Sequence, residues 1–354
     1  MESAKELKGF NKRIIIFSLE NAHNSRTKTY FDGIKAGGFD CEWFEISSKS
    51  IITSLLAVIS SLPKQNLYFV VASPSHILVP FVFILTRKKP IFDAGWPLID
   101  GVITSRKNWG LFGLGFVKIL LIDLMSIIFA KKVFVETMEQ KIRLSKFYFL
   151  YRKKFLVMPT GFNELRFGFK NNNFVNQLEN NVLFRGGDLQ EAGIDTLISA
   201  IKISNSGKIG FIIASRSSRL RSLNLLNTLV YSDYLADEDI YNLYIKSKII
   251  LGQLSSHKRT NWTIPHKFFE AAYLGIPYVT SDSLPMLKFE EVNSVKTFKG
   301  GNPTHLLEVI EKLLNDPDEM KELGTNIKIL YELNFRQSVL SENFVKHILE
   351  TETK

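Results

Sequence analysis

The 354-residue sequence contains a single cysteine, Cys41, although 45% of its residues are apolar. One thiol cannot close an internal disulfide, and it cannot supply the paired cysteines of a structural zinc site. We therefore interpret Cys41 as a small buried residue and the setting as a reducing one. The first residues, MESAKELKGFNKR, hold no apolar core of the kind that a secretory signal requires, so we expect a protein that is not exported.

Stretches that could cross a membrane are also scarce. The most apolar run covers residues 109–130, but Lys118 and Asp123 interrupt it, and each such charge near a bilayer centre costs about 2.5–3.5 kcal/mol. A spanning helix is therefore not expected. Two interpretations stay open: a helix buried in a domain core, and a helix that lies partly in the lipid interface with basic residues at its ends near the headgroups.

Several motifs of known chemistry are missing as well. The sequence has no P-loop, no Gly-x-Ser-x-Gly elbow and no Gly-x-Gly-x-x-Gly fingerprint after its first predicted strand. It also lacks a cluster of His, Cys, Asp and Glu with the spacing of metal ligands. We therefore expect neither a metal nor a bound cofactor.

The net charge of +10 arises entirely in the first half of the chain. Residues 1–170 carry 25 Lys and Arg against 13 Asp and Glu, whereas residues 171–354 carry 20 against 22. The basic residues form short clusters beside apolar stretches rather than a stripe with interleaved aromatics, so a nucleic-acid partner is not expected. The pattern suits an anionic membrane surface, and the alternative is a solvated basic face without a partner. The clusters are Arg87-Lys88-Lys89, Arg106-Lys107, Lys131-Lys132 and Arg152-Lys153-Lys154.

Short runs of β-branched and aromatic residues alternate with longer amphipathic segments, which is typical of βαβ units and parallel sheets. Strands are predicted at residues 13–18, 41–46, 67–72, 90–93, 132–136, 155–158, 181–184, 208–213, 228–231, 248–252, 277–280 and 294–297. The pattern predicts an α/β protein with two doubly wound, Rossmann-like domains facing a cleft, in which ligands bind at the carboxyl ends of the strands.

The domain boundaries follow from a polar stretch at residues 170–173 that interrupts this pattern. We place a first domain at residues 1–170 and a second at 171–334. Helices are predicted at residues 303–315, 317–330 and 335–350. The segment 335–354 is expected to pack back toward the first domain.

The most informative segment reads IPHKFFEAAYLGIPYVTSD, at residues 264–282. Pro265 suits the start of a helix, whose free backbone N–H groups and positive dipole end favour an anion. Lys267 and Glu270 are three residues apart and so share one face of that helix. A phosphate could meet Lys267 and the helix start, while Glu270 accepts hydrogen bonds from the hydroxyls of a sugar. The alternative is an ordinary amphipathic helix with an ion pair between Lys267 and Glu270.

A second element precedes this helix at residues 182–188, where a strand enters a turn with paired glycines, Gly186 and Gly187. Glycines at the carboxyl end of a strand let the backbone approach a ligand closely, and Arg185 offers a planar donor fork for a phosphate. By itself, such a turn is weak evidence for binding.

The two elements together, in this order and about 80 residues apart, resemble the donor half of GT-B glycosyltransferases, in particular the retaining family 4. The matching positions of its Pro-x-Lys-x-x-Glu-x-x-x-x-Gly-x-Pro pattern are Pro265, Lys267, Glu270, Gly275 and Pro277. The resemblance implies a hexosyltransferase that uses a nucleotide sugar, with a UDP-sugar favoured, as co-substrate. It also implies GT-B architecture and transfer without a metal.

The resemblance further implies a role for each residue of the donor site. Glu270 would bind the ribose hydroxyls, and Gly186 and Gly187 would allow close approach to the sugar or phosphate. The segment Tyr231–Tyr234, with Tyr231 as the named contact, would lie against the base. The diphosphate would contact Lys267 and the backbone of Thr263, Ile264, Pro265 and His266, with Arg185 as a further cation.

Two positions depart from the family pattern. Trp262 stands where an acidic residue normally precedes Glu270 by eight positions, and Ala192 stands where a basic residue normally precedes Gly193. Both changes leave room for a non-catalytic GT-B-like subunit or a nucleotide-sugar-binding module that partners an active transferase. An exported sugar-binding protein would have similar gross architecture, but it would not explain the helix that carries Lys267 and Glu270.

Catalytic candidates in the first domain are Asp93, which ends the fourth predicted strand, and His23, in the loop after the first. A capping carboxylate and a hydrogen-bonded loop histidine are the alternatives for these two. The sequence as a whole thus predicts a glycosyltransferase that modifies a lipid-linked or polysaccharide acceptor. We expect it to be cytoplasmic and peripheral on the inner face of the membrane.

Overall fold

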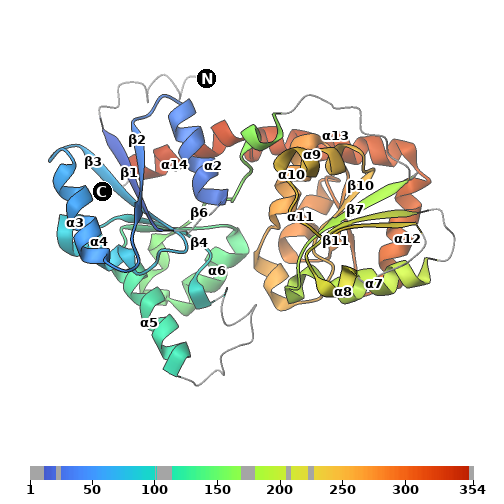
Figure 1. The fold of residues 1–354 in the computed structure, drawn as a ribbon, viewed down its shortest axis with the longest axis horizontal. Helices are drawn as coiled ribbons and strands as arrows, with labels where there is room; N and C mark the ends of the chain where they lie inside the picture. The colour runs from blue at the N-terminus through green and yellow to red at the C-terminus, as the bar shows by residue number, and fades with distance from the viewer. Residues whose placement is uncertain are drawn as a thin grey trace. The chain divides into compact units, whose positions relative to one another are not determined.

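The computed structural model describes residues 12–20, 25–99, 101, 114–168, 180–204, 209–221 and 227–350. The chain divides into two compact units (Figure 1). Unit 1 comprises residues 1–163 together with 336–354, and unit 2 comprises residues 164–335. The candidate His23, the predicted linker at 170–173 and the cluster Arg106-Lys107 lie outside the described residues.

The described part of unit 1 contains a six-stranded parallel sheet in the order β2-β1-β3-β4-β5-β6. Its strands alternate with helices along the chain, as βαβ units require. The strands are β1 (Arg13–Leu19), β2 (Cys41–Ile46), β3 (Leu67–Ala72), β4 (Ile91–Gly95), β5 (Lys132–Val135) and β6 (Phe155–Val157). The helices are α2 (Ser25–Ala36), α3 (Ile51–Ser61), α4 (Leu78–Thr86), α5 (Leu114–Phe129), α6 (Met138–Phe147), the 3-10 helix η3 (Phe149–Lys154) and α14 (Gln337–Leu349).

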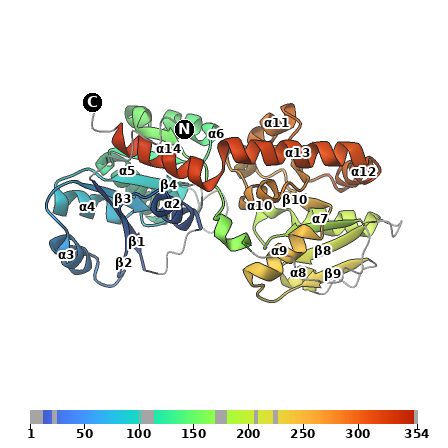
Figure 2. The same ribbon diagram turned by 90° about the horizontal axis from the view of Figure 1, so that it is seen from above.

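Helices cover both faces of this sheet, because consecutive strand residues point to opposite sides. Ile15 and Phe17 pack with residues of α3, α4, α5 and α6. Ile14 and Ile16 pack on the other face with α2 and α14. Figure 2 shows α14 running along α2, where the Gln337 side chain donates to the carbonyl of Thr29 at 2.8 Å. The C-terminal helix is therefore part of the core of unit 1.

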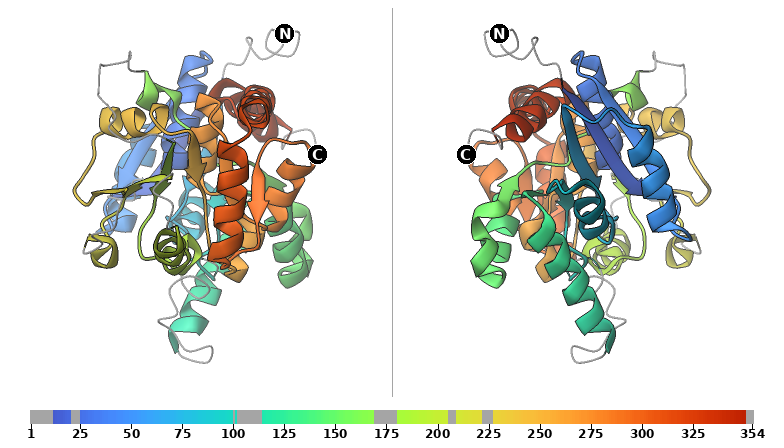
Figure 3. Two further views of the ribbon diagram at one scale, coloured as in Figure 1. Left: turned by 90° about the vertical axis from the view of Figure 1, so that its right-hand side faces the viewer. Right: turned by 90° about the vertical axis from the view of Figure 1, so that its left-hand side faces the viewer.

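The described part of unit 2 contains a second six-stranded parallel sheet, in the order β12-β11-β10-β7-β8-β9. Figure 3 faces this unit in its left-hand view and unit 1 in its right-hand view. The strands are β7 (Asn181–Arg185), β8 (Gly210–Ala214), β9 (Thr228–Tyr231), β10 (Ile249–Leu251), β11 (Tyr278–Ser281) and β12 (Lys296–Phe298). The helical elements are η4 (Glu164–Phe167), η5 (Gln190–Ala192), α7 (Ile194–Ile203), α8 (Ser218–Arg221), α9 (Asp237–Ile245), η6 (Lys258–Trp262), α10 (His266–Leu274), α11 (Leu284–Glu291), α12 (Pro303–Leu314) and α13 (Pro317–Asn334).

The predicted α/β class with two doubly wound sheets is confirmed, and each predicted strand is found with its ends displaced by at most two residues. The two sheets nevertheless differ in strand order. Unit 2 reverses its order between its first and fourth strands, β7 and β10, which is the order of dinucleotide-binding folds. Unit 1 reverses between β1 and β3. Such reversals open a crevice at the carboxyl ends of the two strands concerned, so they locate the expected ligand site of each unit.

Helix α5 contains nearly all of the described part of the apolar run at residues 109–130, which begins at Leu114. Asp123 is buried and accepts hydrogen bonds from the backbone N–H groups of Leu98 at 3.0 Å and Ile99 at 2.9 Å. The face of α5 that carries Asp123 packs against the rest of unit 1, whereas Leu121 and Met125 are exposed. In the part of the chain that the structure describes, no helix is both long enough and apolar enough to cross a membrane.

Candidate active site

The main cavity of unit 2 lies at the carboxyl ends of β7 and β10, where the strand order reverses. Its volume is about 580 Å³, within the range that holds small-molecule ligands. The loops after β7, β8, β9 and β10 and the start of α10 form its walls. Polar and charged lining residues are Arg185, Glu191, Ser215, Arg216, Asp233, Tyr234, Gln253, Arg259, His266 and Lys267.

The paired glycines after β7 form one wall of the cavity. A Cβ atom at Gly187 would meet nothing within 4 Å, so this glycine leaves open space beside the backbone. Gly193 has a different reason to be glycine. Its φ is +72°, and a Cβ atom there would lie 2.6 Å from the backbone of Leu254 and Ser255. The loop after β7 can therefore pack directly against the loop after β10 only because residue 193 has no side chain.

Helix α10 begins with its amino end at the cavity. Pro265 is its N-cap residue, and Gly275 ends the helix in the left-handed conformation with φ +71°. Lys267, in the first turn, places its Nζ 3.3 Å from the carbonyl of Gly252 and 4.9 Å from the centre of the Phe184 ring. Burial, together with the positive charge of Arg185, lowers the pKa of Lys267 to about 7. An anion in the cavity would favour the charged form of Lys267.

Glu270 lies one turn deeper and is fully buried. Its Oε2 accepts hydrogen bonds from the hydroxyl of Tyr244 at 2.5 Å and from Arg185, and its Oε1 lies 3.3 Å from Nδ1 of His266. Arg166 approaches the same carboxylate at 3.6 Å. Burial alone would raise the pKa of the Glu270 carboxyl, but Arg185, with hydrogen bonds from His266 and Tyr244, holds it well below its usual range.

The alternative of a simple ion pair between Lys267 and Glu270 does not describe this helix. Among the described residues, the ion pairs of Glu270 are with Arg166, Arg185 and His266. Lys267 faces the cavity instead, while Glu270 points into a buried network. The two side chains therefore meet different surroundings although they share one face of α10.

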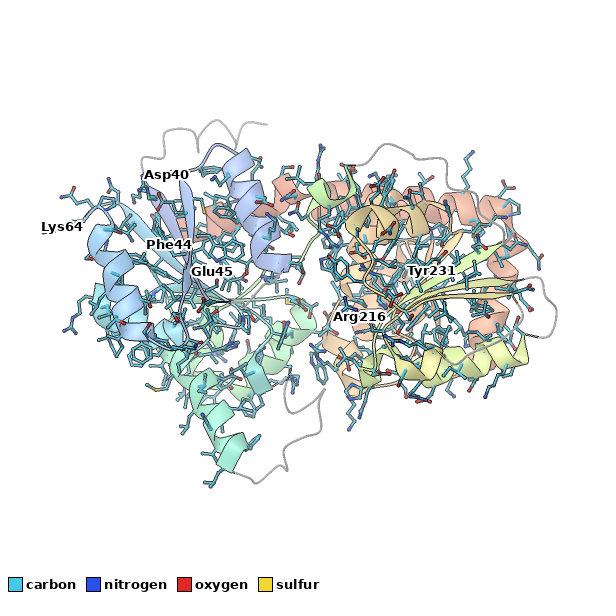
Figure 4. The ribbon with its side chains drawn as sticks, in the orientation of Figure 1. Asp40, Phe44, Glu45, Lys64, Arg216 and Tyr231 are labelled. Carbon is cyan, nitrogen blue, oxygen red and sulfur yellow. The ribbon has the colours of Figure 1, made fainter. Side chains whose placement is uncertain are left out.

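Two further cations reach the cavity from elements that the sequence motif does not include. Arg259, from η6, forms an ion pair with the buried Glu191, next to Ala192. Arg216 follows β8 and lies over the ring of Tyr234, with 5.6 Å between its guanidinium carbon and the ring centre. Figure 4 labels Arg216 and Tyr231 at the neighbouring carboxyl ends of β8 and β9. Arg259 thus brings positive charge to the place where Ala192 supplies none.

The structure brings together six of the predicted donor-site residues as cavity lining: Arg185, Gly186, Gly187, Pro265, His266 and Lys267. Thr263, Ile264 and Tyr231 are not among the lining residues, and Glu270 lies behind Arg185. Sequence reasoning missed Arg216 and Arg259, whereas Tyr234 lies in the segment that was predicted to meet the base. The loops of the two arginines carry no motif, so only the fold could show that they meet the motif residues.

Asp93 in unit 1 has a different environment from the one expected for a catalytic group. It is buried, and its carboxylate accepts hydrogen bonds from the buried Arg26 at 2.7 Å, 2.9 Å and 3.1 Å. The same guanidinium donates to the carbonyl of Met158 at 2.7 Å. These contacts support a structural role for Asp93, and its catalytic role remains a prediction.

The described residues contain no group of three potential metal ligands. Side chains of both signs line the cavity of unit 2. Arg185, Arg216, Arg259 and Lys267 line it, against the carboxylates of Glu191 and Asp233.

Two Rossmann-like units, each with a parallel six-stranded sheet, define a protein of the GT-B class. Solved structures agree. Sucrose-phosphate synthase from Thermosynechococcus elongatus matches with a TM-score of 0.74 at 13% identity, covering 97% of this chain and 100% of that one. Anabaena Alr3699/HepE in complex with UDP-glucose matches with a TM-score of 0.66 at 12% identity, covering 96% and 99%. WaaG, a glycosyltransferase involved in lipopolysaccharide biosynthesis, matches with a TM-score of 0.64 at 13% identity, covering 95% and 99%.

The sequence supports the same class. Residues 203–351 match the family model described as "Glycosyl transferase-like". The chain thus has the GT-B fold, and its segment 203–351 is similar to glycosyltransferases, which confirms the predicted resemblance at the level of the fold and of this segment. Comparison with curated protein sequences gave no match.

Proposed function

We propose that this protein transfers a sugar from a nucleotide diphosphate sugar, with a UDP-sugar favoured, to a lipid-linked or polysaccharide acceptor. The observation that carries the proposal is the cationic cavity at the strand-order reversal of unit 2, where a helix amino end and four cationic side chains converge. The binding of UDP-glucose by the structurally similar HepE supports the choice of donor.

The cations of the cavity suit the diphosphate of such a donor. Lys267 and the first turn of α10 would face the phosphates, and Arg259 would replace the basic residue that is missing at Ala192. Charge builds up on the diphosphate as the glycosidic bond breaks, and preorganised cations stabilise it most at that stage. We propose that this stabilisation allows retaining transfer without a metal.

The ribose contact proposed for Glu270 requires a rearrangement. Arg185 and Tyr244 occupy Oε2, and the residue has no exposed surface in this structure. We propose that Arg185 turns from Glu270 toward the diphosphate when the donor enters, which exposes a carboxylate oxygen to the ribose hydroxyls. While Arg185 is paired with Glu270, the low pKa keeps the carboxylate ionised, and the contacts with His266 and Tyr244 continue to favour the ionised form after Arg185 has turned.

Titration calorimetry with UDP, GDP, ADP and their glucose conjugates tests the donor site. We expect one nucleoside diphosphate and its sugar conjugate to bind, and Glu270→Gln to weaken that binding by at least about tenfold, the cost of losing a hydrogen bond to a charged group. Glu308→Gln, which changes an exposed acid on α12, is the matched control and should bind as the unaltered protein does. Binding of none of the six compounds would refute the proposal, as would undiminished binding by a folded Glu270→Gln variant.

A second candidate is a non-catalytic GT-B-like subunit that binds a nucleotide sugar and partners an active transferase. Trp262 and Ala192, at positions where family 4 enzymes carry charged residues, favour this candidate. Acceptor-dependent release of free nucleotide by the purified protein would exclude it. Binding of the donor without any such release, over a panel of lipid-linked and polysaccharide acceptors, would support it.

A further inference from the structure

The fold gathers three of the basic clusters of the sequence at one edge of the unit 1 sheet. Strands β4, β5 and β6 are neighbours and run parallel, with Ile91 beside Lys132 and Val133 beside Phe155. The residues that precede each strand therefore lie at a common amino edge. We call the resulting set the amino-edge surface: Lys88, Lys89, Lys131, Lys132, Arg152 and Lys153.

Several contacts confirm that these residues are close together. Lys88, Lys89 and Lys131 line one cavity of about 270 Å³, together with residues of β3 and β4. The Nζ of Lys132 lies 3.4 Å from the carbonyl of Lys153. Lys64, labelled in Figure 4, precedes the next strand, β3, and adds an exposed cation to the same edge.

Lys154, which follows Lys153 in the chain, is close enough to the cations of the amino-edge surface to be affected by their charge. Its Nζ donates to the carbonyls of Ile127, Ile128 and Ala130, each at 2.8 Å. Burial, and after it the charge of Lys89, lowers the pKa of Lys154 to about 8. An anion at the amino-edge surface would relieve this repulsion.

The six cations of the amino-edge surface are not neutralised by carboxylates of the described residues. Within the described residues, no carboxylate lies within ion-pairing distance of any of them. Five of the six are exposed, and Lys132 is partly buried. A surface of this kind attracts an anionic partner from outside the chain.

Large exposed apolar side chains lie close in the chain to two of these cations. Phe147, Phe149 and Leu150 are 54%, 66% and 73% exposed, and they precede Arg152 by two to five positions. Aromatic and aliphatic side chains that accompany Lys and Arg at a surface can enter the headgroup region of a bilayer, while the cations meet the phosphates. A nucleic acid would use the cations but would leave Leu150 without a partner.

We propose that the amino-edge surface docks unit 1 on a bilayer rich in anionic phospholipids. The sequence predicts contact of the basic clusters with an anionic membrane, and the fold adds that three of these clusters share one edge of the sheet. The position of the amino-edge surface also has a consequence for the acceptor, and this consequence rests on the proposed function. The carboxyl end of β3 lies a strand length away, about 20 Å, which suits an extended polysaccharide acceptor better than a sugar linked directly to a headgroup.

Sedimentation with vesicles tests the docking without any sugar transfer. The full chain is mixed, without donor or acceptor, with one of two kinds of vesicle. One kind contains phosphatidylcholine alone, and the other contains phosphatidylcholine with about one third phosphatidylglycerol. We expect binding to the anionic vesicles only. The triple variant Lys88→Ser, Lys89→Ser, Lys131→Ser should lower the partition coefficient about 100-fold, since each cation near such a surface contributes about a fivefold factor.

Two further variants separate the surface from overall charge. The control Lys202→Ser, Lys312→Ser, Lys321→Ser removes three exposed lysines of unit 2 and should reduce binding much less. Phe149→Ser with Leu150→Ser should weaken binding by a factor that does not depend on salt, because apolar burial is not screened. All substituted side chains are exposed, and circular dichroism verifies that each variant is folded.

The proposal is overturned if the triple variant binds as the unaltered protein does, or if the unit 2 control loses as much. It is also overturned if single-stranded RNA of similar charge density binds more tightly than the vesicles and Phe149→Ser with Leu150→Ser has no effect on vesicle binding. Because nucleotide binding is measured separately, failure here leaves the donor site intact, and failure of the donor site leaves this result unchanged.

Discussion

Each unit contains a buried pair of an arginine and a carboxylate near the carboxyl ends of its strands, but the two pairs differ in surroundings. In unit 1, Arg26 holds Asp93 and the carbonyl of Met158. In unit 2, Arg185 holds Glu270 and also lines a cavity of about 580 Å³. The strand order explains the difference, because Arg185 ends a strand at the reversal of unit 2, whereas Asp93 lies on β4, outside the reversal of unit 1. The same pair can thus stabilise one sheet and serve a binding site on the other.

Asp93→Asn should have the largest effect on stability. The substitution leaves the buried guanidinium of Arg26 without its carboxylate, which costs about 3–5 kcal/mol when one partner of a buried pair is removed. We expect urea unfolding to show this loss in the free energy of unfolding. Nucleotide affinity, measured on the folded variant, should be unchanged. A decrease of less than about 1 kcal/mol in the free energy of unfolding would show that Asp93 and Arg26 are only weakly paired. If the variant is stable and binds nucleotide but has no transferase activity, the result would support the catalytic role predicted from the sequence.

Lys267→Met should reduce nucleotide affinity without a comparable loss of stability. It removes a cation that faces the cavity and that forms no ion pair with a described carboxylate. The loss of one charge-assisted hydrogen bond to phosphate corresponds to about 1.5–3 kcal/mol, or about 10–150-fold in Kd. Calorimetric titration measures it, with Lys202→Met on α7 as the control. Equal affinities for the two variants would remove Lys267 from the donor site.

The affinity for a nucleotide sugar should fall as pH rises above 7. The pKa of Lys267 is about 7 in the free protein, and the diphosphate raises it in the complex, so binding takes up a proton between the two values. The affinity for the nucleotide sugar is therefore highest and constant below pH 7. Above pH 7 it declines by up to about tenfold per pH unit, until the pH reaches the pKa of Lys267 in the complex. The Lys267→Met variant should show a flat profile, and a flat profile in the unaltered protein would contradict the mechanism.

Tyr234→Ala and Tyr231→Ala should differ modestly in how much they weaken the affinity for the nucleotide, whose base we expect to lie near these residues. Tyr234 is 79% exposed, lines the cavity and stacks with Arg216, so its removal should cost about 1 kcal/mol of nucleotide affinity. Tyr231 ends β9 and does not belong to the lining residues. The measurement is the affinity for uridine diphosphate and for guanosine diphosphate. A larger loss of affinity in Tyr231→Ala than in Tyr234→Ala would place the base contact at the first residue of the segment predicted from the sequence rather than at its last.

Local pattern was sufficient to predict the strands, the α10 helix and its two caps. Alternation of apolar runs with amphipathic segments is a property of neighbouring residues, and Pro265 and Gly275 act within one helix. Because these patterns involve only neighbouring residues, they could not reveal cavity residues that come from distant parts of the chain. Arg259 lies 67 positions from Ala192, and nothing within either loop indicates that Gly193 lets the two loops meet.

By itself, the sequence determined the parallel α/β architecture, the glycosyltransferase resemblance and the confinement of the net positive charge to the first half of the chain. Only the tertiary structure decided which of the basic clusters lie together. Clusters separated by more than 40 positions, such as Lys88-Lys89 and Lys131-Lys132, meet because β4 and β5 are parallel neighbours in register. Spatial adjacency across a sheet depends on strand order, and strand order is set by long-range packing rather than by any local run of residues.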